Sequence, residues 1–269
     1  MTPLMTKIAL TIAGVDPSGG AGTLADVKTF AAFGVFPTAA IASITFQNTQ
    51  GVFGAEHQSA GSVKQQITLI LDDYEVAAVK TGMLPTREII EEVAAIIVER
   101  ELKNVVVDPV VRSTSGFDLI DNAALRSLIE KLFPLADIIT PNIPEAERIS
   151  GVAIESESDI HDAAAVMRDL GARNVLIKGG HLASGESERR KAKDFLFLGD
   201  ELTILEGEFF ETTATHGTGC TLSSAIAANL ALGNDLLTSV EIAKRFVNEA
   251  IRTAPMIGRG HSPINIKPI

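Results

Sequence analysis

The amino-acid sequence predicts an α/β protein with a mostly parallel central sheet and helices on both of its faces. Short runs rich in β-branched residues alternate along the chain with longer amphipathic segments. This alternation is typical of βαβ units joined by right-handed crossovers. The short runs are almost wholly apolar, as parallel strands covered on both faces are. Most of them are followed by Gly, Pro or Asn, residues that favour turns.

The individual elements follow from these patterns in chain order. The expected strands are Ile8–Ala13, Thr38–Ser43, Val76–Lys80, Val105–Val107, Ile138–Thr140 and Val175–Lys178. The expected helices lie near residues 22–33, 60–72, 86–101, 122–132, 158–170, 218–232 and 236–253. The segment 86–101 shows the helical pattern most clearly, because its apolar residues recur at i, i+1, i+4, i+7 and i+8 on one face.

A polar stretch and a hairpin complete the second half of the chain. Residues 183–193 are rich in charged and small residues, which favours a solvated loop, with a flap over a ligand as the second interpretation. The following segments Phe195–Leu198 and Thr203–Leu205 flank Gly199-Asp200 and predict a β-hairpin. Without an internal repeat or a Pro-rich linker, we expect residues 1–269 to form a single domain.

Composition excludes several functional classes. The 269 residues carry a formal net charge of −11 and one cysteine, so neither an internal disulfide nor a Cys-rich zinc site can form. The acidic balance argues against nucleic acid as a partner. No apolar run reaches the roughly 18 residues of a membrane span, and the N-terminus has no apolar signal-peptide core. We therefore expect a cytoplasmic enzyme or binding protein with no membrane partner.

The first glycine-rich segment is Gly14–Gly22, directly after the first expected strand. Parallel sheets bind ligands at the carboxyl ends of their strands, so this loop is a candidate ligand loop. It matches neither a Walker A motif nor a Gly-x-Gly-x-x-Gly fingerprint. A tight strand-to-helix turn without a ligand is an equally weighted alternative. Asp26, one turn into the helix, either reaches back to a ligand or faces water.

The second glycine-rich segment, Thr215–Thr221, opens a helix of small residues. Unpaired N–H groups of residues 217–220 and the helix dipole would together create an anion site. Cys220 lies within this N-terminus, where a thiol pKa is expected to fall. The thiolate could serve as a general base toward a substrate hydroxyl, or as a covalent nucleophile with His216 as its weakly supported partner. A buried, inert cysteine is the plain alternative.

Eight ordered motifs then resemble one family over nearly the whole chain: the hydroxymethylpyrimidine/phosphomethylpyrimidine kinases of thiamine biosynthesis, in the ribokinase-like superfamily. The motifs are Ala13–Gly22, Ala25–Phe30, Gln47-Asn48-Thr49, Lys80–Leu84, Val107–Val110, Thr140–Ala146, Lys178–His181 and His216–Thr221. The resemblance implies a three-layer α/β/α, ribokinase-like fold. It also implies an ATP- and Mg²⁺-dependent kinase that phosphorylates 4-amino-5-hydroxymethyl-2-methylpyrimidine and then its monophosphate, and a homodimer.

The resemblance assigns roles to particular residues. Cys220 would be the catalytic base, and the N–H groups of Gly217, Thr218 and Gly219 would hold the transferring phosphoryl group. Lys178, Asp108 and Asn142 would bind the nucleotide. Glu145 and Asn142 would organise Mg²⁺, largely through water.

The substrate would be held by a second group of residues. The carboxamide of Gln47 can pair with the edge of an aminopyrimidine, because it offers one acceptor and two donors. Gly14, Met83 and Val110 would line the ring faces, where apolar atoms and a thioether suit a flat heterocycle. Asp26 would contact the polar end of the pocket.

Several alternatives stay open at this point. Pyridoxal kinases of the same branch share most of the motifs, although they differ at Gln47-Asn48. A non-catalytic ligand sensor and a Cys-dependent acyl-transfer enzyme are alternatives from other functional classes. The chain also departs from the family pattern: the segment Val111–Gly116 lacks the lysine that many members have there near the nucleotide, and Ser262 replaces a glycine in the tail. Arg112 either supplies positive charge or faces solvent, and the tail carries no assigned role.

Overall fold

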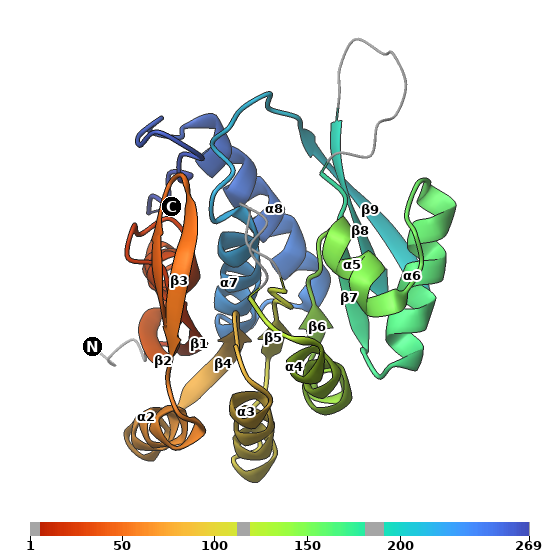
Figure 1. Cartoon of the computed structure of the whole chain (residues 1–269). Coiled ribbons are helices and arrows are strands. Elements are labelled where there is room, and N and C mark those ends of the chain that lie inside the picture. The colour runs from red at the N-terminus through yellow and green to blue at the C-terminus, as the bar shows by residue number, and fades with distance from the viewer. Residues whose placement is uncertain (1–5, 112–118, 181–190, 269) are drawn as a thin grey trace, which may run out of the picture.

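The computed structural model describes residues 6–111, 119–180 and 191–268, and a single sheet runs through this part of the chain (Figure 1). The sheet has nine strands in the order β3-β2-β1-β4-β5-β6-β7-β8-β9. Their bounds are β1 Ile8–Val15, β2 Phe36–Asn48, β3 Gly51–His57, β4 Val76–Thr81, β5 Val105–Val107, β6 Ile138–Ile139, β7 Asn174–Lys178, β8 Lys191–Leu198 and β9 Glu201–Glu208.

The centre of the sheet is parallel and its two edges are antiparallel. Strands β2, β1, β4, β5, β6 and β7 pair in parallel with their neighbours. Strand β3 pairs antiparallel with β2 at one edge, and β8 and β9 extend the other edge in the same antiparallel manner. The prediction of a mostly parallel sheet is therefore confirmed, and so is the hairpin around Gly199-Asp200, which is longer than expected.

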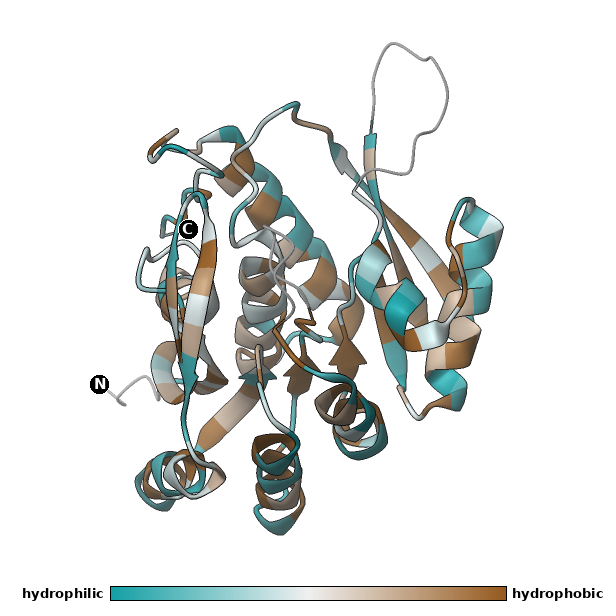
Figure 2. Ribbon diagram, in the orientation of Figure 1, coloured by the Kyte–Doolittle hydropathy of each residue, from teal (hydrophilic) through white to brown (hydrophobic). Residues whose placement is uncertain are grey.

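Helices cover both faces of the sheet. Their bounds are α1 Gly22–Ala32, α2 Ala60–Asp73, α3 Arg87–Glu99, α4 Asn122–Ser127, α5 Ile143–Ser150, α6 Glu157–Asp169, α7 Thr218–Ala231 and α8 Leu236–Arg252. Helices α2 to α6 pack on the core layer that contains Leu10, Ile12 and Val107, whereas α1, α7 and α8 pack on the layer with Ala9 and Val106. Alternate residues of each strand thus enter opposite layers. The expected three-layer α/β/α arrangement is confirmed, and Figure 2 shows apolar residues on the inner sides of α2 and α3.

Three local features differ from the sequence prediction. Strand β2 continues past Ser43 to Asn48 and turns into β3, which places Gln47 on a strand. Helix α5 forms where the sequence shows only a motif. The helix predicted over 122–132 instead becomes α4, a π-helical turn at Leu128–Leu132 and a 3-10 turn at Phe133–Leu135.

The carboxyl ends of the parallel strands meet along one edge of the sheet. Strands β1, β4, β5 and β7 end at Val15, Thr81, Val107 and Lys178, and each is followed by one of the sequence motifs. The loops after these strands therefore lie together, where parallel sheets bind their ligands. Among the described residues, no helix is long and apolar enough to span a bilayer.

Candidate active site

A cavity of about 410 Å³ opens at this edge of the sheet. All the site residues expected from the sequence line it except Asp26: Gly14, Gln47, Met83, Asp108, Val110, Asn142, Glu145, Lys178, Gly217, Thr218, Gly219 and Cys220. The residues come from loops that are far apart in the chain. The fold therefore brings the two glycine-rich segments and the Asn142–Glu145 motif into one cavity.

The two glycine-rich loops touch each other through their backbones. Gly217 is the N-cap of α7 and has a φ of 87°, in the left-handed region that favours glycine. A Cβ atom at Gly217 would lie 1.8 Å from the carbonyl oxygen of Gly20. No side chain caps α7, and Gly217, Thr218, Gly219 and Cys220 of its first turn line the cavity, as an anion site at a helix start requires. The N–H of Thr218 also donates to the carbonyl of Thr215 at 3.3 Å.

The thiol of Cys220 is half-buried at the wall of this cavity. Burial raises its pKa to about 11, a shift that Lys80 opposes and that the nearby carboxylates of Asp26 and Asp108 reinforce. The backbone N–H of Gly22 donates a hydrogen bond to the sulfur and acts in the opposite direction. The expectation of a lowered thiol pKa is therefore wrong, because burial outweighs the helix N-terminus.

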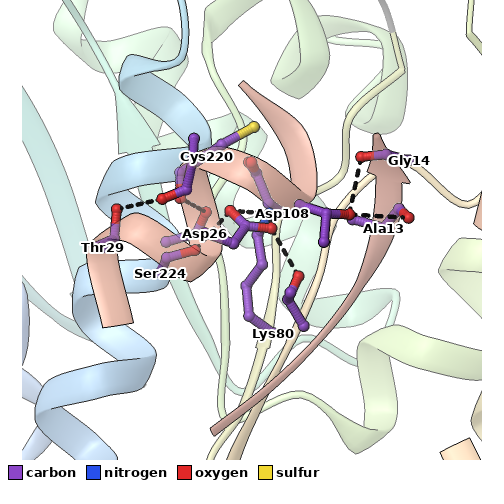
Figure 3. Close-up of polar contacts among 12 residues, drawn as sticks. Ala13, Gly14, Asp26, Thr29, Lys80, Asp108, Cys220 and Ser224 are labelled. Atoms are coloured by element: carbon purple, nitrogen blue, oxygen red, sulfur yellow. Dashed lines mark hydrogen bonds and ion pairs between the residues drawn. The ribbon is translucent and has the colours of Figure 1, made fainter. Parts of the chain in front are cut away.

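Asp26 does not line the cavity, contrary to the expected substrate contact. Its side chain is fully buried, and its carboxylate accepts hydrogen bonds from Thr11 at 2.6 Å and Ser224 at 2.7 Å. It also forms an ion pair with the buried Lys80 at 2.9 Å, and Figure 3 shows Asp26 beside Lys80 and Ser224. With its oxygens occupied, Asp26 supports the floor of the site and holds Lys80 close to Cys220.

A second cluster of charges lies beside the second glycine-rich segment, Thr215–Thr221, which we call the anion loop. Lys178 Nζ is 3.1 Å from Asp108 Oδ1, which also accepts a hydrogen bond from Thr140 at 3.2 Å. Burial opposes the ionisation of Asp108, but Lys178 and Lys80 hold the pKa of this carboxyl below its usual value. A Cβ atom at Gly219 would lie 3.0 Å from Lys178 Nζ. The ammonium group is therefore adjacent to the backbone donors of α7.

Asn142 and Glu145 form a capping box that starts α5. The Asn142 side chain accepts from the N–H of Glu145 at 2.9 Å, and Glu145 Oε2 accepts from the N–H of Asn142 at 2.8 Å. Burial raises the pKa of Glu145 to about 7; Lys178 opposes the shift and Asp108 adds to it. The helix cap fixes the Glu145 carboxylate at the cavity wall, where a cation would favour its ionised form.

The substrate end of the cavity is apolar with a few polar groups. Met83, Val110 and Gly14 line it together with Gln47. A Cβ atom at Gly14 would lie 3.1 Å from Met83 Sδ, so glycine keeps the space beside the thioether open. A flat heterocycle with one polar edge fits a surface of this composition.

Asp16 is a site residue that the sequence prediction missed. Its carboxylate accepts hydrogen bonds from the backbone N–H groups of Ser18 and Ala21 at 2.8 and 2.9 Å and from His216 Nε2 at 2.7 Å. Burial opposes its ionisation, but hydrogen bonds from His216, Gln47 and Ser18 hold the pKa of Asp16 far below its usual value. His216 therefore pairs with Asp16 and not with Cys220, which removes its expected role as a base for the thiol. The position of Asp16 directly after the first strand is the signal that could have identified it.

A buried pair at another part of the cavity wall was also missed. Lys244 Nζ lies 2.6 Å from Asp194 Oδ2, and Asp194 Oδ1 accepts from the backbone N–H of Gly179 at 3.1 Å. The pair joins α8 and β8 to the loop after Lys178. The partners are fifty residues apart in the chain, and no local pattern indicates that they meet. Arg112, His181 and most of the polar stretch 183–193 lie outside the described residues.

The tail that carried no assigned role packs on the site. The N–H of His216 donates to the carbonyl of Ser262 at 3.3 Å, and the N–H of Ile264 donates to the carbonyl of His216 at 3.4 Å. The N–H of His261 donates to the carbonyl of Thr49 at 2.7 Å. The tail therefore joins the anion loop to the turn that follows Gln47.

The mostly parallel three-layer fold, with the second glycine-rich loop beside Lys80 and Lys178 in one cavity, defines a small-molecule kinase of the ribokinase-like class. The model of the phosphomethylpyrimidine kinase family matches residues 16–265, and the chain belongs to this family. The hydroxymethylpyrimidine/phosphomethylpyrimidine kinase of Haemophilus influenzae is 44% identical over 260 residues, 96% of each chain.

Solved structures agree with this assignment. The phosphomethylpyrimidine kinase of Clostridium difficile 630 is 41% identical and superposes with a TM-score of 0.80, covering 91% of this chain and 100% of that one. The ADP complex of Bacillus subtilis pyridoxal kinase is 37% identical with a TM-score of 0.86, covering 97% of each chain. The family resemblance stated from the motifs is thus confirmed, and the shared fold by itself does not separate the two kinase activities.

Proposed function

We propose that this protein is a hydroxymethylpyrimidine/phosphomethylpyrimidine kinase, which uses ATP to phosphorylate 4-amino-5-hydroxymethyl-2-methylpyrimidine and then its monophosphate in thiamine biosynthesis. The observation that carries the proposal is the composition of one cavity. It contains a carboxamide suited to an aminopyrimidine, a thiol at a helix N-terminus and a lysine beside the same backbone donors. Family membership over 16–265 and the names of the relatives support the same activity.

Each group has a distinct task in the proposed reaction. Gln47 pairs with the pyrimidine edge, and Met83 and Val110 contact the ring faces. The thiolate of Cys220 takes the proton of the substrate's hydroxymethyl group. The oxygen of that group attacks the γ-phosphorus of ATP, and ADP leaves. Lys80 stabilises the thiolate, and the N–H groups at Gly217–Gly219 bind the oxygens of the transferred group.

Lys178, Asp108 and Asn142 would bind the phosphates of ATP. Lys178 is next to the anion loop and is held there by Asp108. The ADP complex of the related pyridoxal kinase supports ATP as the phosphate donor. The cavity continues past Lys178 to the buried pair Asp194–Lys244, which leaves room for the rest of a nucleotide.

The donor set also fits Mg²⁺. Glu145 and Asp108 present carboxylate oxygens, the hard ligands that Mg²⁺ prefers, and they influence each other's charge. The described residues contain no group of three His, Cys, Asp or Glu placed to hold a metal, which suits an ion that keeps most of its waters and binds phosphate oxygens. When bound, Mg²⁺ would neutralise charge on the phosphates.

A homodimer is part of the proposal. Phe46 and Phe53 are 54% and 71% exposed on the β2–β3 hairpin, and Ile44 on the same hairpin is 42% exposed. Strand β3 is also an edge strand. Exposed apolar side chains next to an open sheet edge are typical of an interface, and we place the partner copy here. A kinase of thiamine biosynthesis that uses ATP is expected to work in the cytoplasm.

A coupled ADP-release assay across three acceptors tests the function. We expect turnover of the hydroxymethylpyrimidine and of its monophosphate, with a lower kcat/KM for pyridoxal. Gln47→Ala should raise the KM for the pyrimidine far more than the KM for ATP, because only the pyrimidine contact is lost. Equal kcat/KM for pyridoxal and the pyrimidine would favour a vitamin kinase of broader specificity. Tight binding without turnover would favour a sensor, and a covalent adduct at Cys220 an acyl-transfer enzyme.

A further inference from the structure

The starting observation is the hydrogen bond between Asp16 and His216, which joins the two glycine-rich loops. The Nε2–Oδ2 distance is 2.7 Å, and the side chains of both residues are largely buried, with 2% of Asp16 and 14% of His216 exposed. A carboxylate only accepts hydrogen bonds, so His216 Nε2 carries the proton and donates it. Neither residue is needed for the chemical step proposed above.

On the anion side, His216 directly precedes the loop that receives the phosphoryl group. Its ring packs so closely on Gly20 that a Cβ atom there would lie 2.3 Å from His216 Cδ2. Its backbone is held on the opposite side by Ser262 and Ile264. The position of Gly217 is thus set by the side chain and the backbone of the residue before it.

On the substrate side, Asp16 organises the first loop. Besides His216, its two oxygens accept from the backbone N–H groups of Ser18, Gly20 and Ala21 at 2.8 to 3.2 Å. The Gln47 side chain lies beside the same carboxylate and helps to keep the pKa of Asp16 low. A carboxylate cannot donate, so it attracts the amide N–H of Gln47 and leaves the carbonyl oxygen for the pyrimidine edge.

We infer that Asp16 and His216 are a positioning pair that fixes two parts of the site relative to each other. One part is the first glycine-rich loop with the Gln47 carboxamide, which holds the acceptor. The other is the second glycine-rich loop, which holds the phosphoryl group. The inference rests on the proposed function for the identity of the acceptor. Its physical basis is the distance between the reacting atoms, since a displacement of about 1 Å can reduce a rate about 10²-fold. Both loops are fixed by one carboxylate, so loosening the bond between Asp16 and His216 affects alignment before it affects the binding of either reactant alone.

Two substitutions at His216 separate the hydrogen bond from packing. His216→Phe keeps an aromatic ring against Gly20 and removes the donor, whereas His216→Gln keeps an N–H donor and removes the ring. We expect His216→Phe to lower kcat for the pyrimidine about 10²-fold with less than a threefold change in the KM for ATP. His216→Gln should recover at least tenfold of this loss. The same two exchanges at the exposed His161 on α6 serve as matched controls and should leave kcat unchanged.

Amide hydrogen exchange of peptides that cover 215–219 supplies a readout that needs no acceptor. We expect faster exchange in His216→Phe than in His216→Gln, at unchanged melting temperature of the folded protein. If both variants lose kcat and protection equally, or if His216→Phe retains full kcat, the positioning pair is refuted. If the wild-type protein does not phosphorylate the pyrimidine, the proposed function fails, and the exchange experiment still decides whether the pair locks the loops.

Discussion

At the scale of single residues, Cys220 combines a helix N-terminus with burial among charged groups. Desolvation and the carboxylates of Asp26 and Asp108 favour the thiol, while Lys80 and the helix end favour the thiolate. The balance raises its pKa to about 11, so only a small fraction is ionised at neutral pH. The buried pair of Lys80 and Asp26 therefore matters for function, since it keeps a positive charge beside the sulfur.

Cys220→Ala should lower kcat about 10²–10⁴-fold, the range for a lost general base, with little change in ATP affinity measured by calorimetry. Because the thiol must lose its proton and its pKa lies above neutrality, kcat of the wild-type enzyme should rise with pH between 6 and 9. Cys220→Asp should restore part of the rate with a profile shifted to lower pH, because a carboxylate ionises at a lower pH than a thiol in the same place. Full activity in Cys220→Ala would rule out the base.

Residue-level prediction from the sequence succeeded where the family motifs pointed to particular residues. Gln47, Lys178 and Glu145 were expected at the site and line the cavity. The expected substrate contact of Asp26 is wrong. Its position one turn into the helix does not reveal that Lys80, Thr11 and Ser224 occupy its carboxylate. The pKa of Cys220 could not be predicted either, since it depends on burial and on charges from three other segments, those of Asp26, Lys80 and Asp108.

At the scale of elements, the start of α7 depends on close backbone packing. Gly217 has a left-handed φ and meets the carbonyl of Gly20 without a side chain between them. The sequence predicted a helix start and an anion site here, but it could not show the contact with the first loop. The sequence also does not predict the β2–β3 hairpin, because its exposed aromatic residues and glycines break the apolar pattern expected of a buried strand.

Gly217→Ala should disrupt this packing. The new Cβ atom would lie 1.8 Å from the Gly20 carbonyl oxygen, so the two loops must separate and kcat should fall about 10²-fold. Gly233→Ala is the matched control, because Gly233 follows α7 with a φ of 92° and a Cβ atom there would meet nothing within 4 Å. It should cost only about 1–2 kcal/mol of stability from the left-handed conformation. Similar kcat values for the two variants in steady-state assays would contradict the packing argument.

At the scale of the whole molecule, the sheet carries both the cavity and the proposed dimer surface. Its parallel centre presents the strand ends that form the cavity, while its antiparallel edge at β3 exposes Phe46 and Phe53. The parallel centre follows from the alternating sequence patterns and from the rule of right-handed crossovers, which do not fix the strand order. The β8–β9 edge could be predicted as a hairpin, whereas the β3 edge could not, because a strand of mixed polarity carries a weak signal.

Phe53→Ala should weaken the proposed dimer. An aromatic side chain at the centre of an interface contributes about 2 kcal/mol or more, so the dissociation constant should rise at least about 30-fold. Sedimentation velocity across a concentration series measures this change. Leu69→Ala on α2 is the control, since Leu69 is also 71% exposed but is not part of the hairpin. A monomeric wild-type protein, or an equal effect of both variants, would exclude this interface.

The tail has a practical consequence for work on this enzyme. Residues 262–264 hold His216 by two backbone hydrogen bonds, and His261 is bonded to Thr49 beside the Gln47 strand. Residues 261–264 are thus close to the reacting groups, although the sequence motifs end about forty residues earlier. Substitutions in this segment would therefore perturb the active site, even though no motif marks it.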